Sequence, residues 1–227
     1  MLRGRRLALA FALGAVGYAT MSGLFLWGVE RTNAGLAGIL LYTYPAFVLV
    51  LAVVFLDERI TRNTVVAVVL SLAGVTLVSG GQPAGIDPLG VAILLSAAVV
   101  YAGYITVSRV VLDEIDPATL TAHVVPAAAV SFFAYGLLSG RLAVPTTLDQ
   151  WGIVGGVALV ARAVPILAFF GAIASIGASR SSVVSTFEPV FTVALGAALL
   201  GEAVTAATVA GGLAVLAGVV LVERELE

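Results

Sequence analysis

Long apolar stretches separated by short polar breaks run through the whole chain. Eight of them reach or approach the length of roughly 20 residues that a helix needs to cross a bilayer. They cover residues 7–29, 34–56, 63–79, 88–111, 118–138, 151–175, 181–200 and 205–222. This pattern predicts an all-α, polytopic membrane helix bundle with eight transmembrane helices. Because the connections are short, consecutive helices are expected to run antiparallel.

Composition supports a lipid environment for most of the chain. Of the 227 residues, 61% are hydrophobic and 11% are charged, and the mean hydropathy is +1.14. A soluble domain of this length still needs a polar shell, so the lipid bilayer is the expected partner. The net charge of -2 gives no basic stripe, which argues against nucleic acid binding. The single His and the absence of Cys argue against a metal site, and no cofactor is expected.

The first apolar stretch follows a basic start and could be mistaken for a signal peptide. It continues to about residue 29 and more spans follow, so it predicts an uncleaved first helix. With the N-terminus in the cytoplasm, only Arg31 and Arg141 lie at outer helix ends. Eight arginines then lie at inner ends: Arg3, Arg5, Arg6, Arg59, Arg62, Arg109, Arg180 and Arg224. This bias predicts a multi-pass protein of the cell membrane with both termini cytoplasmic.

The chain also resembles itself at an offset of 144 residues. The stretch that starts at Pro45 aligns without a gap with the stretch that starts at Pro189. Several matched pairs are of residue types that rarely coincide by chance: Phe47 with Phe191, Glu58 with Glu202, Thr61 with Thr205, Thr64 with Thr208, and Gly74 with Gly218. Helices 2 and 3 thus match helices 7 and 8. An offset of five helices predicts that the two copies cross the membrane in opposite senses, as in many secondary transporters.

The matched segments divide the chain into two repeats. Residues 1–80 form a first repeat of three helices, and residues 81–227 form a second repeat of five helices. The prediction is therefore an inverted repeat with an incomplete first unit. Helices 4 and 5 have no partner in the first repeat.

The paired motifs "YTYPAFVLVLAVVFLDERI…LAGVTLV" and "STFEPVFTVALGAALLGEAV…LAGVVLV" resemble the EamA-type transporters of the drug/metabolite transporter superfamily. The resemblance covers nearly the whole chain. It implies ten helices in two five-helix repeats, and export or facilitated passage of amino acids and other small metabolites. Compared with that pattern, this chain lacks the first two helices, through either a late start codon or a shortened form.

Two ionisable residues stand inside predicted spans. Glu188 directly precedes Pro189, which removes a helical hydrogen bond to the carbonyl of Ser185. A carboxylate there is expected to face a hydrated cavity and substrate, or to fix helix packing. Arg162 lies near the middle of helix 6. By helix rise, Glu188 lies about 12 Å and Arg162 about 20 Å from the inner end, so either a buried pair or a fixed cation for a substrate carboxylate is expected.

Three tyrosines and the single histidine complete the candidate binding residues. Tyr101 and Tyr104 share one face of helix 4, and Tyr44 lies beside Pro45. Each tyrosine offers an apolar ring and a hydroxyl, which suits an amphipathic metabolite, although simple packing explains them equally well. His123 is either a hydrogen-bonded structural residue or a proton relay.

These observations favour a secondary transporter of small organic solutes over an enzyme. An intramembrane hydrolase is the alternative, but the G-x-S-x-G motif is absent and the only His lies near a helix end. A partner-dependent, truncated transporter that is inactive alone is the third hypothesis. The sequence leaves the substrate and the oligomeric state open, a homodimer included.

Overall fold

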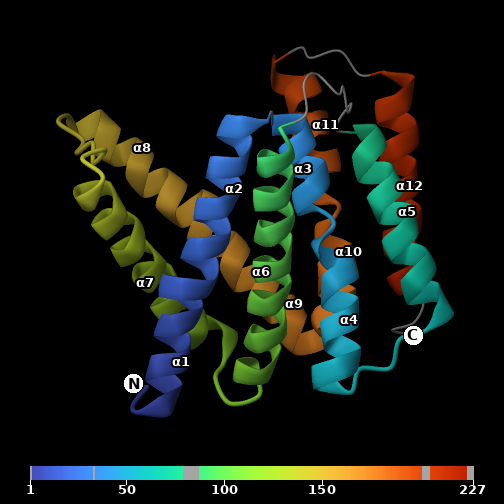
Figure 1. Cartoon of the computed structure of the whole chain (residues 1–227), viewed down its shortest axis with the longest axis horizontal. Helices are drawn as coiled ribbons and strands as arrows, with labels where there is room; N and C mark the ends of the chain where they lie inside the picture. Colours follow the sequence, from blue (N-terminus) through green and yellow to red (C-terminus); the bar gives the residue numbers. More distant parts are fainter. Residues whose placement is uncertain (1, 33, 79–86, 201–204, 224–227) are drawn as a thin grey trace. The chain divides into compact units, whose positions relative to one another are not determined.

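A computed structural model describes residues 2–32, 34–78, 87–200 and 205–223, and all regular elements in these ranges are helices. The first long helix comprises α1, a π-helical segment η1, and α2. The elements are α1 (Arg5–Ala12), η1 (Leu13–Tyr18), α2 (Ala19–Arg31), α3 (Ala34–Leu41), α4 (Tyr44–Leu56), α5 (Arg62–Val78), α6 (Pro88–Leu112), α7 (Pro117–Leu138), α8 (Leu148–Ala158), η2 (Leu159–Ala163), α9 (Val164–Ile176), α10 (Ala178–Ser185), α11 (Glu188–Leu200) and α12 (Ala206–Glu223) (Figure 1).

Each of the eight predicted stretches is largely helical in its described residues, which confirms the all-α class and the polytopic membrane bundle. Within the described residues, five helical runs are long and apolar enough to cross a membrane: Arg5–Arg31, Leu36–Leu56, Pro88–Leu112, Pro117–Leu138 and Leu148–Ile176. Two shorter apolar helices cover Arg62–Leu77 and Val209–Leu221. The number of eight crossings stays a prediction. Glu202 and Arg224, used in the repeat and in the charge bias, lie outside the described residues.

The chain divides into two compact units. Unit 1 comprises Met1–Thr20 and Val107–Ser175, and unit 2 comprises Met21–Thr106 and Ile176–Glu227. These units cut across the two predicted repeats, because each repeat contributes helices to both. Packing in space therefore follows a different division from the one that the self-similarity of the sequence indicates.

Within unit 1, the first helix packs tightly against α7. A Cβ atom on Gly14 would lie 2.2 Å from the carbonyl oxygen of Val124, so only glycine allows the two backbones to approach this closely. Further along α7, the Ser131 hydroxyl donates a hydrogen bond to the carbonyl oxygen of Ala15 at 2.9 Å. These contacts fix α7 along the segment η1.

Within unit 2, α5 and α12 form the most extensive helix pair. A Cβ atom on Gly74 would lie 2.5 Å from the carbonyl oxygen of Gly211. One on Gly218 would lie 2.9 Å from the carbonyl oxygen of Ala67. Because the later residue of each helix meets the earlier residue of the other, α5 and α12 run antiparallel. Small residues permit this close approach of the two backbones, as is usual between membrane helices.

Polar side chains outside the spans cap the helix starts. Asp116 accepts a hydrogen bond from the backbone N–H of Thr119 at 2.9 Å, which lowers the pKa of that carboxyl below its ordinary value. Thr61 Oγ1 accepts a hydrogen bond from the N–H of Thr64 at 3.1 Å. Thr61 therefore caps the start of α5.

Candidate functional site

Two helices of unit 2 are interrupted at matching places. The first interruption lies between the end of α3 at Leu41 and the start of α4 at Tyr44. The second lies between the end of α10 at Ser185 and the start of α11 at Glu188. A shift of 144 residues places one interruption on the other. The sequence predicted that Pro189 removes one helical hydrogen bond near Glu188. In the structure the helix ends there and a new helix begins.

A proline stands second in each restarted helix. Pro45 and Pro189 lack the N–H that would continue the preceding helix, and each ring disfavours helical geometry in the residue before it. A hydrogen bond between residues three positions apart bridges each gap. The N–H of Ala46 donates to the carbonyl oxygen of Thr43, and the N–H of Val190 donates to the carbonyl oxygen of Phe187. The sequence therefore causes both interruptions by the same local chemistry.

The two interruptions contact each other through Tyr44. Its side chain is 2% exposed, and its hydroxyl donates to the carbonyl oxygen of Ser182 at 3.3 Å. The same hydroxyl is hydrogen-bonded to the hydroxyl of Ser185. The last turn of α10 is thus tied to the first residue of α4. This places the predicted site residue Tyr44 directly between the broken helices.

A cluster of four tyrosine rings extends from this junction. The ring centroids of Tyr44 and Tyr101 lie 4.5 Å apart, and those of Tyr101 and Tyr104 lie 6.1 Å apart in a stacked arrangement. Tyr42 adds a fourth ring, 6.2 Å from that of Tyr44. The structure therefore brings the three predicted tyrosines together, with Tyr42 as an unpredicted neighbour.

Glu188 joins the tyrosine cluster through Tyr42. The Tyr42 side chain is hydrogen-bonded to the Glu188 side chain. Glu188 is exposed and is the first residue of α11, where the helix dipole favours a negative charge. A carboxylate in this position can hold a cation, while the partial positive charge at the starts of α4 and α11 favours an anion.

The short helix α10 gives the junction a polar wall. Ser179, Ser181 and Ser182 are buried, and the hydroxyls of Ser179 and Ser181 have no hydrogen-bond partner among the described residues. At the start of α10, the Glu58 carboxylate accepts hydrogen bonds from the N–H of Ala178 at 2.9 Å and of Ser179 at 3.3 Å. Glu58 therefore caps a helix that is distant in sequence, a role that sequence analysis did not assign to it.

Arg162 belongs to unit 1 and has a partner there. It lies in the π-helical segment η2, and its guanidinium donates to the hydroxyl of Tyr18 at 3.3 Å. Tyr18 ends the other π-helical segment, η1, and the two residues are 144 positions apart. Two residues separated by the predicted repeat offset thus contact each other, whereas the sequence suggested only Glu188 as a partner of Arg162.

His123 also lies in unit 1, on α7. Its Nδ1 atom lies 2.8 Å from the carbonyl oxygen of Thr119, one helical turn earlier. Because a carbonyl only accepts, the Nδ1–H tautomer donates this bond. The ring also meets that of Phe11 edge to face, with centroids 6.3 Å apart. These contacts match the structural alternative for His123 that the sequence left open.

Several residues that contact the predicted site residues were not predicted from the sequence. Tyr42, Ser182 and Ser185 contact the predicted residues, and Tyr18 contacts Arg162. A usable signal for the serines was present, since "SRSSVVST" is unusually polar for a membrane-spanning segment. Tyr18 and Tyr42 carry no comparable signal, because a tyrosine in an apolar helix is more often a packing residue.

Comparisons with known proteins agree with the membrane transporter architecture. A sequence model of the EamA-like transporter family matches residues 2–80 and 88–224. An uncharacterized transporter of Archaeoglobus fulgidus is 28% identical over 99% of this chain and 80% of its own length. A probable terminal-alkyne amino-acid exporter of Streptantibioticus cattleyicolor is 26% identical over 98% of this chain and 75% of its own length. A solved crystal structure, 17% identical, has the same fold with a TM-score of 0.80 over 96% of this chain and 77% of its own. This chain therefore belongs to the EamA-like transporter family.

Proposed function

We propose that this membrane transporter moves small organic metabolites such as amino acids, as an exporter or facilitator driven by a gradient or by the substrate itself. The observation that carries the proposal is the junction of two interrupted helices, joined by Tyr44 to Ser182 and Ser185 and by Tyr42 to Glu188. Discontinuous helices of this kind form substrate sites in secondary transporters, because their exposed backbone ends bind polar groups.

The junction has the right chemistry for a zwitterion. The Glu188 carboxylate is suited to an ammonium group, and the partial positive charge of the helix starts at Tyr44 and Glu188 favours the carboxylate of the substrate. The rings of Tyr101 and Tyr104 supply an apolar surface for the rest of the substrate. Arg162 and His123, the remaining candidates, lie in unit 1, and Arg162 is proposed as a fixed cation that Tyr18 holds.

The inverted repeat is part of the same proposal. Three pairs of positions 144 residues apart support it: the two helix interruptions, the close contacts of Gly74 and Gly218, and the pair Tyr18–Arg162. The antiparallel course of α5 and α12 fits copies that cross the membrane in opposite senses. The two separate matches of the family model, to residues 2–80 and 88–224, fit the division into repeats at residues 1–80 and 81–227.

Flux measurements on the purified chain in liposomes test this function. The wild-type chain is expected to exchange labelled zwitterionic amino acids, and to discriminate against analogues that lack the ammonium group. Glu188→Gln keeps the size of the side chain and removes its charge. It is expected to lower the flux of zwitterions at least tenfold, the effect of losing about 1.4 kcal/mol of a charge-assisted interaction.

A matched acid-to-amide change at Asp149 serves as the control, because that residue is exposed in the first turn of α8 and outside the junction. Asp149→Asn should leave flux unchanged. Equal flux for Glu188→Gln and wild type would contradict the site. Substrate turnover without flux would favour the intramembrane hydrolase. Flux that appears only after co-expression with a longer relative would favour the partner-dependent form.

A further inference from the structure

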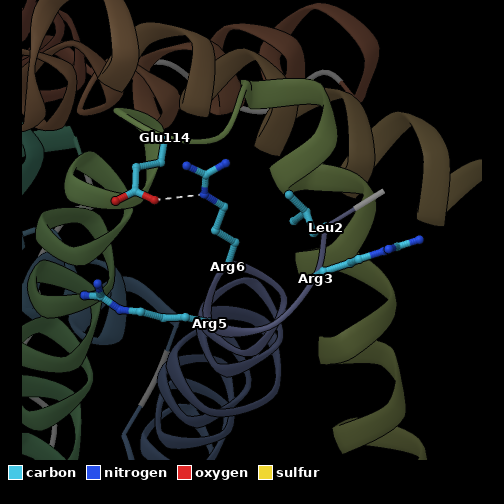
Figure 2. A pocket seen from close by; sticks show the side chains of 5 residues that line it. All are labelled: Leu2, Arg3, Arg5, Arg6 and Glu114. Atoms are coloured by element: carbon cyan, nitrogen blue, oxygen red, sulfur yellow. Dashed lines mark hydrogen bonds and ion pairs between the residues drawn. The ribbon is translucent and has the colours of Figure 1, made fainter.

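A pocket at the N-terminal end of unit 1 lies outside the junction described above. It has a volume of about 470 Å³ and is lined by Leu2, Arg3, Arg5, Arg6 and Glu114. Arg5 and Arg6 are the first residues of α1, and Glu114 follows α6. Figure 2 shows the three arginine side chains spreading from the start of α1, with Arg6 directed to Glu114 and with Arg3 and Arg5 on either side.

The pocket carries more positive charge than its own acid neutralises. Arg6 Nε and Glu114 Oε2 form an ion pair of 2.9 Å, and both side chains are more than half exposed. That pairing leaves the guanidinium groups of Arg3 and Arg5 as the excess charge of the lining. The start of α1 adds the partial positive charge of a helix N-terminus. Guanidinium groups present two parallel N–H donors, which match the oxygen atoms of a phosphate better than an ammonium does.

The pocket also lies where a phosphate would be available. The span Arg5–Arg31 begins at its rim, so its arginines are at the level of the lipid headgroups. Arginine clusters beside a membrane helix attract anionic headgroups strongly. Leu2 contributes an apolar side chain to the same lining, which suits the glycerol and upper acyl region of a lipid.

We propose that this pocket binds a phosphate group, supplied either by an anionic lipid headgroup or by a free phosphate ester. The exposed side chains of Arg3 and Arg5 point to either side of Arg6 in Figure 2, and they turn toward the phosphate when it binds. Glu114 competes with it for Arg6 and thereby limits the affinity. The pocket is a binding site separate from the transport junction, and neither Glu188 nor the tyrosine cluster takes part in it.

Two probes distinguish the sources of the phosphate. Native mass spectrometry of the full chain measures retention of phosphatidylglycerol against phosphatidylcholine, and a thermal unfolding series measures stabilisation by glycerol 3-phosphate. Selective retention of phosphatidylglycerol identifies the headgroup, and stabilisation by glycerol 3-phosphate alone identifies the free ester. A wild-type chain that binds neither probe overturns the proposal.

Charge variants test the named residues with whichever probe binds. The double change Arg3→Gln and Arg5→Gln is expected to weaken binding roughly 25-fold, because each arginine near a headgroup contributes about a fivefold factor. Glu114→Gln is expected to strengthen binding, because it releases Arg6, and a gain of affinity cannot come from misfolding. Unchanged or weaker binding in Glu114→Gln contradicts the proposed competition.

Arg59→Gln with Arg62→Gln is the matched control. These residues are exposed and belong to unit 2, and they are predicted to lie on the same side of the membrane. The control removes the same charge, so it corrects for general attraction to an anionic probe. An equal loss of binding in the pocket variant and in the control would show that the location of the charge is irrelevant, and the proposal would fail.

Discussion

At the scale of single residues, the hydroxyl of Tyr44 determines how the two interrupted helices meet. Tyr44→Phe removes the hydrogen bonds to Ser182 and Ser185 and keeps the ring. Because the site is buried, the expected loss is about 1 kcal/mol in the free energy of unfolding. Unfolding of the purified chain in detergent measures it. Tyr135→Phe is the control, since that side chain is 63% exposed. Equal stability of the two variants would contradict a structural bond at the junction.

The neighbours of the two charged residues inside the spans could not be predicted from the sequence. Glu188 and Arg162 stand out in the sequence because an ion inside an apolar span is costly. Tyr42 and Tyr18 could not be identified as their neighbours, because a partner is set by helix rotation and packing. A rise of 1.5 Å per residue gives only the depth of a residue along its own helix.

At the scale of elements, the pair of α5 and α12 depends on two glycines. Gly74→Ala places a Cβ atom 2.5 Å from the carbonyl oxygen of Gly211, so the helices must separate. Overpacking of this kind costs about 1–3 kcal/mol, and thermal unfolding should show a matching loss of stability. The control is Gly155→Ala in α8, where the new Cβ has no neighbour within 4 Å. That variant should be as stable as wild type or slightly more stable. A tolerated Gly74→Ala would show that the helices have room to shift.

Helix interruptions were only partly predictable at this scale. Pro189 after an acid indicated a disturbed helix, and the interruption between α10 and α11 follows. The equivalent interruption before Pro45 lies in a stretch that sequence analysis treated as one helix over residues 34–56. An intact helix and an interrupted helix have the same local pattern of apolar residues. The pattern therefore does not show where a helix is interrupted. The π-helical segments η1 and η2 left no sequence signal for the same reason.

At the scale of the whole molecule, we propose that both termini lie in the cytoplasm. The chain contains no Cys, so single cysteines can report the orientation without a background. A membrane-impermeant maleimide should label Ala143→Cys in intact cells, because the segment after α7 is predicted to lie outside. It should label Asp113→Cys only after the cells are permeabilised. The reverse pattern would refute the orientation, and equal labelling of both would indicate insertion in two directions.

The sequence by itself determined the helical class, the membrane environment, the positions of the helices and the repeat offset of 144 residues. These properties follow from local apolar composition, since a bilayer admits long apolar segments as helices whose backbone is satisfied internally. The tertiary structure alone decided that Tyr44 contacts α10, that Tyr42 meets Glu188, and that Glu58 caps α10. Such contacts join residues more than 100 positions apart. They depend on how the helices rotate and pack against one another. The hydrophobic pattern does not encode this packing, because almost every position of the helices is apolar.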